Sequence, residues 1–429
     1  MTSTVGTLTS ATATPTSLNA YTSTTYNFTI VPANAIPIGG VILITIPSEI
    51  TISNPTFTAN SCSSTRRNLR NKDFIRELAS TGLESTFYCN ATPTTITVID
   101  GFQSSNFSAG GTISFDIDGI LNPRSLQPSS TFTVNTQTSD GFQINQLTSG
   151  INVTMTSVSQ FNLVSLSSTS LVNSASNNIT FTINSPSILI DGDILSITFP
   201  SQVTLPSSFT CVGVTNLASS LTCSLSGTVL NITLNFSSSN LTAGTSFIFT
   251  LQSITNPSST QSTDTFSFSV SSSGGFLIND YSADVKLTTT TPSTITSASL
   301  TQSSLDANAT NDVTFSITLI NNIAAGGTLS LIYPSQITVT AATLSAELVL
   351  PTAIASLTDT LTSSSRRIDI TDMFPSGATA GGTYQFIIKN LRNSEFADQT
   401  SSFQITTYTD SSRTYSIDRV NSGLTMSAN

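Results

Sequence analysis

The sequence predicts an all-β protein built from three tandem antiparallel β-sandwich domains that form an extended rod. One observation is a repeat: the segment Ala109–Phe115 returns as Ala243–Phe249 and again as Ala380–Phe386. A second is a strand-like segment in each repeat, such as Tyr26–Ile30, in which apolar and polar residues alternate. A third is the spacing of turn signals at about 8–12 residues, which is typical of β-sandwiches. Tandem copies of one folding unit mostly supply length and surface.

Each repeat is expected to contain the same short strands in the same order. A lead-in rich in Ser and Thr precedes the alternating strand, whose later copies are Ile179–Ile183 and Val313–Ile317. A glycine-marked turn then precedes an apolar strand that ends in proline, which suits a strand end because it cannot donate a hydrogen bond to a sheet. The apolar strands are Gly40–Pro47, Gly192–Pro200 and Gly327–Pro334.

The repeat places the three domains at residues 1–154, 155–286 and 287–429. No long Gly/Ser-rich or Pro-rich spacer separates them, so the strands are expected to run almost directly from one domain into the next. This arrangement favours a stiff rod over flexibly linked beads.

The methionines suggest that the array is longer than this sequence. Met1, Thr2 and Ser3 align with Met155, Thr156 and Ser157 at the next repeat boundary, and Thr425, Met426 and Ser427 stand where a fourth repeat would begin. We therefore expect Met1 to be an internal residue and residues 1–429 to be a segment of a longer array.

One insertion breaks the repeat. Residues 64–86 lie between Cys62 and Cys89, and Asn71–Leu78 within them is predicted to form a short helix that stops before Gly82. The insertion is either an element that docks on an acidic neighbour or a solvated loop, and the loop is the favoured interpretation. It carries five of the thirteen Lys and Arg residues, namely Arg66, Arg67, Arg70, Lys72 and Arg76.

Composition argues against several classes of function. A net charge of −10 offers no basic surface for nucleic acid and disfavours binding to anionic membranes. No apolar run approaches the length of a membrane-spanning helix. Histidine is absent, so the commonest general base and neutral metal ligand are missing, and nothing activates the many Ser and Thr hydroxyls. We expect no enzyme activity and no cofactor.

The four cysteines are predicted to form one disulfide in each of the first two repeats. Cys62 and Cys211 each follow a proline-ended strand, and Cys89 and Cys223 each precede a strand rich in Thr, Ile and Val. Pairs Cys62–Cys89 and Cys211–Cys223 would indicate an oxidising compartment. The alternative is four free buried thiols. Because the third repeat has no cysteine, the disulfide is an accessory of the fold.

Glycosylation sequons are the strongest local signal in the chain. Asn106 and Asn240 stand at equivalent positions before the Ala-Gly turn, the exposed kind of place that a glycan needs. We expect several sequons to carry glycans if the source is eukaryotic. The nine candidates are Asn27, Asn90, Asn106, Asn152, Asn178, Asn231, Asn235, Asn240 and Asn308.

Two pairs of carboxylates are candidates for a calcium site between domains. Asp116 and Asp118 lie on one face of a predicted strand, and Asp191 and Asp193 flank a glycine turn. The other repeats lack acidic residues at the positions of the first pair, and no dense run of acidic ligands is present. Solvated surface carboxylates are the favoured interpretation of both pairs, and no metal is expected.

The strand that ends in Pro-Ser at Gly40–Ser48, the turn at Ala109–Thr112 and the Asn-Pro turn at Ile120–Pro123 recur along the chain. Together they resemble the immunoglobulin-like tandem repeats of large surface glycoproteins of microbial eukaryotes. The resemblance implies an extracellular, structural or adhesive role without enzyme activity, and it assigns no site residues.

The predicted function is that of a structural repeat unit of an extracellular glycoprotein fibre, filament or surface coat. Assembly would use domain stacking and strand exchange between copies of the chain or neighbouring repeats. The alternative is a cell-surface adhesin for a carbohydrate or protein ligand, with residues 64–86 as its contact element. The candidates for exchanged strands are the lead-ins at residues 1–20, 155–175 and 287–305.

Overall fold

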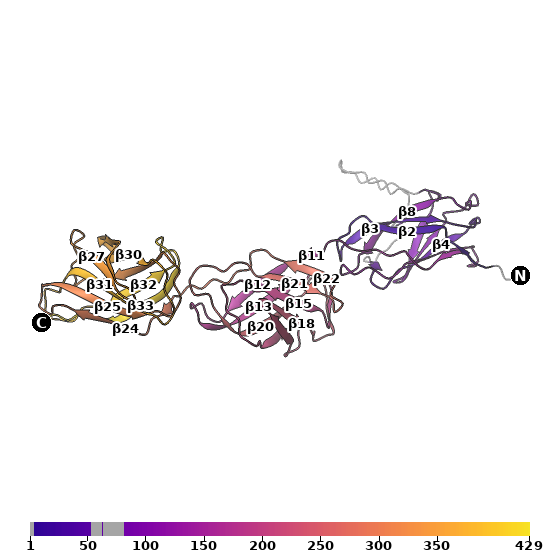
Figure 1. Ribbon diagram of the computed structural model, residues 1–429. Helices are drawn as coiled ribbons and strands as arrows, with labels where there is room; N and C mark the ends of the chain where they lie inside the picture. The colour runs from indigo at the N-terminus through magenta and orange to yellow at the C-terminus, as the bar shows by residue number, and fades with distance from the viewer. Residues whose placement is uncertain (1–3, 53–61, 63–80) are drawn as a thin grey trace.

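A computed structural model describes residues 4–52, 62 and 81–429 of the protein. Three sandwiches follow one another in a row (Figure 1). We call the three sandwiches unit 1, unit 2 and unit 3. Each has its own hydrophobic cluster, and the clusters span Leu8–Met155, Phe161–Leu287 and Ile295–Met426. The protein is thus all-β, an extended rod of three immunoglobulin-like β-sandwiches, as the sequence predicts.

Unit 1 consists of a six-stranded and a four-stranded sheet. In spatial order, the larger sheet contains β1 (Gly6–Thr7), β10 (Gln143–Leu147), β9 (Thr133–Gln137), β4 (Val41–Thr45), β7 (Thr95–Ile99) and β6 (Tyr88–Ala91). The smaller sheet contains β2 (Ser10–Pro15), β3 (Ser23–Val31), β8 (Ile113–Leu121) and β5 (Thr51–Ile52).

Unit 2 repeats both sheets and adds a short strand pair. The larger sheet contains β11 (Ser159–Gln160), β22 (Leu277–Tyr281), β21 (Ser267–Ser271), β15 (Ile194–Thr198), β18 (Val229–Thr233) and β17 (Thr222–Ser226). The smaller sheet contains β12 (Leu163–Ser168), β13 (Ser176–Asn184), β20 (Ser246–Thr255) and β16 (Cys211–Thr215), and the added pair is β14 (Leu189–Ile190) with β19 (Asn240–Leu241).

Unit 3 has the same larger sheet and a five-stranded second sheet. The larger sheet contains β23 (Ser293–Thr294), β33 (Ser416–Leu424), β32 (Phe403–Tyr408), β26 (Gly327–Ile332), β30 (Arg367–Phe374) and β29 (Asp359–Thr362). The second contains β24 (Ala298–Gln302), β25 (Thr310–Thr318), β31 (Thr383–Arg392), β27 (Ser345–Leu350) and β28 (Ile354–Leu357), and a 3-10 turn at Ser363–Ser365 follows β29.

The alternating strands build the core as predicted. In β3 the side chains of Tyr26, Phe28 and Ile30 are fully buried, whereas the intervening residues are half-buried. Phe28 stacks on Phe115 of β8 with ring centroids 5.9 Å apart. Burying a phenylalanine side chain contributes about 1.5–3 kcal/mol, so these rings are a main source of stability. Equivalent stacked pairs are Phe181–Phe249 in unit 2 and Phe315–Phe386 in unit 3.

The lead-ins are built into their own units, which limits the idea of strand exchange. Each begins with a two-residue strand that pairs in parallel with the larger sheet, where β1 meets β10, β11 meets β22 and β23 meets β33. Each then forms an antiparallel edge strand of the other sheet, namely β2, β12 and β24. Donating a lead-in to another chain would break all of these pairs. The parallel pairs also depart from the purely antiparallel pairing expected.

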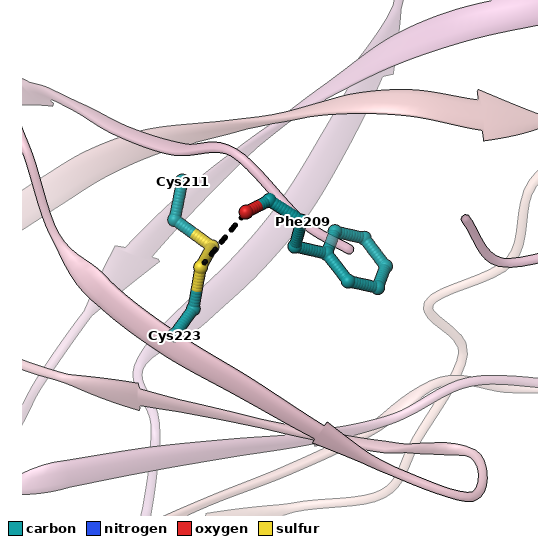
Figure 2. The surroundings of a disulfide bond; sticks show 3 residues. All are labelled: Phe209, Cys211 and Cys223. Carbon is teal, nitrogen blue, oxygen red and sulfur yellow. Dashed lines mark hydrogen bonds between the residues drawn. A yellow bond between two sulfur atoms is a disulfide. The ribbon is translucent and has the colours of Figure 1, made fainter. Parts of the chain in front are cut away.

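Both predicted disulfides form, Cys62–Cys89 and Cys211–Cys223, with Cα atoms 5.4 and 6.4 Å apart. Cys211 lies on β16 at the edge of the smaller sheet and Cys223 on β17 at the edge of the larger sheet. The second bridge therefore closes one side of the sandwich, beside the Phe209 carbonyl (Figure 2). The predicted helix at residues 71–78 and the five basic residues of the insertion lie outside the described residues.

Unit 3 closes the same side without a disulfide. Its strand β28 pairs with β27 in the second sheet, and β29 pairs with β30 in the larger sheet. Only Thr358 separates the two strands, so the backbone itself crosses between the sheets. This continuous crossover explains why the third unit keeps the fold without cysteines.

Candidate functional site: the junctions between units

The asparagine of the Asn-Pro turn, which is an Asn-Ser turn in unit 3, organises the exit end of each unit. In unit 2, Asn256 is buried, and its Nδ2 donates hydrogen bonds of 2.9 Å to the carbonyls of Ser170 and Val172 in the lead-in. Its Oδ1 accepts a hydrogen bond from Asn177 Nδ2 at 2.8 Å. An asparagine side chain has two donors and an acceptor, so it can hold the lead-in loop and the β13 strand together. Asn122 and Asn393 make the same two bonds to their lead-ins.

The lead-in loop held in this way receives the linker to the next unit. At the first junction Ala20 N donates to Ser157 O at 2.8 Å, and Leu18 O accepts from Thr156 N at 3.0 Å. At the second junction Asn173 N donates to Thr291 O at 2.9 Å. The linkers are thus paired to the preceding unit and leave no free spacer, in agreement with the stiff connection that the sequence predicts.

The loop after the Asn-Pro turn donates directly to the next unit. Leu126 N bonds Leu277 O at 2.9 Å, and Thr260 N bonds Ser416 O at 3.0 Å. Leu277 and Ser416 occupy equivalent positions in their units. Each lies two residues before the residue that pairs with the short parallel strand, which is Asn279 in unit 2 and Asp418 in unit 3. Both junctions therefore join the same position of one unit to the same position of the next.

These contacts define two faces of a unit. The exit face is the lead-in loop together with the loop after the Asn-Pro turn. The entry face is the segment after the alternating strand together with the start of the last strand of the larger sheet. The exit faces are residues 18–21 with 123–126, 171–174 with 257–260 and 305–308 with 394–397; the entry faces are residues 33–35 with 142–145, 186–188 with 276–279 and 320–322 with 415–418.

An ion pair closes the first junction. Arg124 in the exit loop of unit 1 forms a bidentate pair with Asp193 of unit 2, with N–O distances of 2.6 and 3.0 Å. Asp193 is only 1% exposed and also accepts a hydrogen bond from Ile190 N at 2.9 Å. The interpretation of Asp193 as a solvated carboxylate is therefore wrong, because Arg124 buries it at the junction.

A comparison of repeat positions could have found this pair. Asp193 stands where units 1 and 3 have Gly40 and Gly327, since each follows a glycine with a positive φ angle. Arg124 stands where unit 2 has Ser258. Arg124 and Asp193 carry opposite charges on the two sides of one junction, whereas the second junction has the uncharged Ser258 and Gly327 at these positions. This coincidence is the sequence signal for the ion pair.

A buried polar network replaces the ion pair at the second junction. Asn173 Nδ2 of unit 2 donates to the carbonyls of Ser416 and Ile417 at 3.0 and 2.9 Å. Ser174 Oγ donates to Asn321 Oδ1, and Asn321 Nδ2 donates to Asp418 Oδ1 at 2.6 Å. Each of these bonds ends on the entry face of unit 3.

Asp418 is fully buried in this network, and burial raises its pKa above the ordinary value of 3.8, although hydrogen bonds from Asn321 and from Ile320 N oppose the shift. A carboxyl group whose pKa is higher in the folded than in the unfolded state binds its proton more tightly when the protein is folded, so its protonation stabilises the fold. This stabilisation is fully present below pH 3.8, and it is lost as the pH rises through the folded-state pKa. The contribution of Asp418 to the stability of unit 3 is therefore lower at neutral pH than in acid.

We predict that Asp418→Asn becomes more stable relative to the wild type as the pH rises from 3.5 to 7. Both oxygens of Asp418 accept hydrogen bonds, from Asn321 Nδ2 and from the Ile320 and Asn321 amides, so the asparagine NH2 group faces a donor, and that cost is the same at both pH values. The cost of ionising the wild-type carboxyl grows with pH and is absent from the variant. Urea unfolding of both proteins at the two pH values measures the difference, and a difference that does not change with pH would contradict the electrostatic explanation.

The other candidate carboxylates have local partners. Asp116 accepts a hydrogen bond from Asn27 Nδ2 at 2.8 Å, and Asp118 accepts one from Thr25 Oγ1. Asp191 Oδ1 accepts from Phe236 N at 2.6 Å. Among the described residues no group of three or more Cys, Asp or Glu side chains could hold a metal ion, and no helix is long and apolar enough to cross a membrane.

A cavity of about 400 Å³ lies beside the first junction. Tyr21 and Arg124 of the exit face line it, together with Glu49 and, from unit 2, Ile188. Burial opposes ionisation of Glu49, but hydrogen bonds from the hydroxyl and amide of Ser130 outweigh it and hold the pKa below its usual range. The cavity thus carries a carboxylate and a guanidinium on apolar walls.

The asparagines of the sequons differ in their exposure to solvent. Three asparagines are half-buried in strands, and among them Asn27 uses its Nδ2, the atom that would carry a glycan, in hydrogen bonds to Asp116 and Ser114. The half-buried set is Asn27, Asn178 and Asn231. The exposed set is Asn90, Asn106, Asn152, Asn235, Asn240 and Asn308.

The C-terminal methionine, Met426, lies two residues before the repeat position of Met155. Thr400 N donates to Met426 O at 2.9 Å, just as Ser129 N donates to Val153 O at 2.9 Å. Met426 therefore occupies the position of Val153 and not that of Met155. Met1 lies outside the described residues.

No protein-family model and no curated protein sequence matches the chain. Among solved structures, the C-terminal domain of the AgI/II polypeptide BspA of Streptococcus agalactiae covers 62% of this chain and 100% of its own length, with 8% identity and a TM-score of 0.24. A putative membrane-anchored protein of Corynebacterium diphtheriae covers 98% and 91%, with 8% identity and a TM-score of 0.20. A type II cohesin dyad from the ScaA scaffoldin of Acetivibrio cellulolyticus covers 61% and 95%, with 12% identity and a TM-score of 0.20.

Proposed function

We propose that this chain is a structural repeat segment of an extracellular glycoprotein fibre, filament or surface coat. The observation that carries the proposal is that both junctions use the same positions of successive units. Hydrogen bonds from the exit loops and from the linkers hold each unit directly on the next. An array connected in this way transmits force and orientation along its axis, which is what a fibre or stalk requires.

The disulfides support an extracellular or cell-surface location, because such bonds persist in oxidising compartments. All four cysteines are paired. Glycans on exposed sequons would keep the weakly charged strands hydrated and would hinder unwanted pairing of sheet edges. We propose occupancy at exposed sites such as Asn90, Asn106, Asn235 and Asn240, and not at the half-buried Asn27 and Asn231.

Electron microscopy of the native material tests the proposal. We expect filaments or rods in which sandwich units follow one another without gaps. Glycopeptide mass spectrometry of the same material should find glycans on exposed sequons and unmodified Asn27 and Asn231. Native material that contains only isolated short particles at all concentrations would contradict a fibre.

The cavity at the first junction supports a second candidate function, that of an adhesin. A carboxylate, a guanidinium and the Tyr21 ring are groups that commonly bind sugars or peptides in proteins. A glycan-array signal that is lost in Glu49→Ala, with the fold intact, would favour this function. An array signal that is unchanged by the substitution would exclude the cavity as the ligand site.

A further inference from the structure

Unit 3 carries charged side chains on the outer face of its larger sheet. Ile368 and Ile370 of β30 are fully buried in the core. Arg367 and Asp369 alternate with them along the strand, so these two side chains project outward. Arg413, in the hairpin loop between β32 and β33, reaches the same place and pairs with Asp369. Two guanidinium groups and one carboxylate therefore meet on the side of the rod.

A row of directly opposed residues brings a third arginine onto this face. Asp369 pairs with Ser330 of β26, which pairs in turn with Thr406 of β32. Thr406 then pairs with Arg419 of β33. Opposed residues on neighbouring strands project from the same face, and strands lie about 4.8 Å apart, so the row extends about 14 Å from Asp369 to Arg419. We call Arg367, Arg413 and Arg419 the arginine face.

One carboxylate serves as the partner of two of these arginines. Arg367 Nε donates to Asp369 Oδ2 at 3.0 Å, and Arg413 donates to the same oxygen. Asp369 is only 4% exposed, because the arginines cover it. Among the described residues Arg419 pairs with no carboxylate, and its Nε donates to Thr406 Oγ1 at 3.2 Å. Positive charge thus exceeds negative charge on the arginine face.

The three guanidinium groups keep donors that are free to bind an anion. A guanidinium has five N–H donors, and each of these three uses one in the hydrogen bonds among the described residues. Burial, and then the charge of Arg367, lower the pKa of Arg413. The side chains of Arg367 and Arg413 are each 29% exposed, so a ligand can reach them. An added anion would offset the repulsion between them and accept charge-assisted hydrogen bonds.

The fold does not require these arginines. Arg419 stands at the position of Asp280 in unit 2 and of Gln146 in unit 1, since each follows by one residue the first partner of the short parallel strand. The hairpin loop that holds Arg413 spans seven residues, 409–415, whereas its counterparts in units 1 and 2 span five. Units 1 and 2 build the same larger sheet without these features, so the arginine face is an addition that is specific to unit 3.

The surroundings of the arginine face suit a sugar chain better than a protein partner. Between the arginines the row contains Ser330 and Thr406, and neither is aromatic or large and apolar. Among the described residues of this sheet the only exposed large apolar side chain in unit 3 is Ile332, at the end of β26. Stable protein interfaces are centred on apolar or aromatic anchors, which this face lacks.

We propose that the arginine face binds the sulfate or carboxylate groups of an acidic polysaccharide. One anionic group would bridge Arg367 and Arg413, and a further group along the same chain would bind Arg419. Guanidinium groups suit both anions, because their donors match two oxygens at once. The inference goes beyond the proposed function, since it gives the side of the rod a ligand that the junctions do not involve.

The net charge of −10 does not prevent this binding. At physiological ionic strength, charges farther away than about 8 Å are largely screened. The carboxylate in the hairpin loop itself, Asp410, accepts hydrogen bonds from Ser412 N at 2.8 Å and from the Ser412 hydroxyl. It forms no ion pair with the arginines among the described residues.

Calorimetric titration of the whole chain tests the proposal with dextran sulfate and polygalacturonate as the polyanions and uncharged dextran as the neutral probe. We expect binding of at least one polyanion, no binding of dextran, and weaker binding at higher salt. Arg419→Gln should weaken the binding about tenfold, because it removes one charged contact. Arg413→Gln, which leaves Arg367 on Asp369, should weaken it as well. Urea unfolding checks that both variants are folded.

Arg392→Gln is the matched control, because it removes the same charge from the exposed Arg392 of β31 in the second sheet. It should bind like the wild type. A chain that binds neither polyanion, or equal losses in Arg392→Gln and Arg419→Gln, would overturn the site. Polyglutamate bound as tightly as the polysaccharides would overturn the polysaccharide as its ligand. None of these results concerns the fibre, which electron microscopy tests separately.

Discussion

Replacing Asn256 with alanine is expected to destabilise unit 2 by about 2–4 kcal/mol. The substitution removes three hydrogen bonds, two to the half-buried carbonyls of Ser170 and Val172 and one from the Asn177 amide, although each of these groups keeps a second partner. An intramolecular hydrogen bond contributes about 0.5–1.5 kcal/mol to stability. The same lead-in loop carries Asn173, so the second junction should loosen as well.

Urea unfolding measures the first effect, and hydrogen exchange at residues 416–418 measures the second. Asn240→Ala is the control, because Asn240 is exposed and its side chain makes no hydrogen bond among the described residues. We expect a change of less than about 0.5 kcal/mol for the control, as is usual for surface positions. Equal effects of Asn240→Ala and Asn256→Ala would show that the asparagine of the Asn-Pro turn contributes no more to stability than an exposed asparagine does.

Replacing Arg124 with alanine is expected to cost about 2–3 kcal/mol, because it leaves the buried Asp193 carboxylate without its cation. Arg124 is 22% exposed at its side chain, so water partly compensates, and the cost falls below that of a fully buried pair. Most of the loss should appear as weaker contact between units 1 and 2.

The double variant Arg124→Ala with Asp193→Asn separates charge from packing. It removes the unpaired carboxylate and keeps an oxygen that can accept the hydrogen bond from Ile190 N. Denaturant unfolding should show that the double variant is more stable than Arg124→Ala alone. A double variant as unstable as the single one would mean that the pair contributes packing and not charge.

The core of each unit could be predicted from the sequence, because the alternation of apolar and polar residues alone determines which side chains are buried. Tyr26, Phe28 and Ile30 alternate with polar residues, and any strand with that pattern buries one face. The cysteine positions relative to the strands were also sufficient to pair Cys211 with Cys223. Both features depend on residues that are close in sequence or repeat with a fixed period.

The junctions were harder to predict because they join loops that are distant in sequence. Arg124 and Asp193 lie in different units, and each by itself is typical of a solvated loop. The burial of Asp418 likewise depends on Asn321, which comes from another strand connection. The parallel pairing of β1, β11 and β23 had no sequence signal, since two residues are too few to show a period.

Small-angle X-ray scattering of the whole chain tests the central claim, that direct junctions make the three units one stiff rod. The wild-type curve is expected to match the single arrangement of the three units in Figure 1, with a distance distribution that extends to its full length. A variant with a flexible Gly/Ser insertion after Val158 is the reference for a bending array. If the wild-type curve needed the same broad ensemble of bent shapes as that variant, the junctions would not hold the units in line and the account would be wrong.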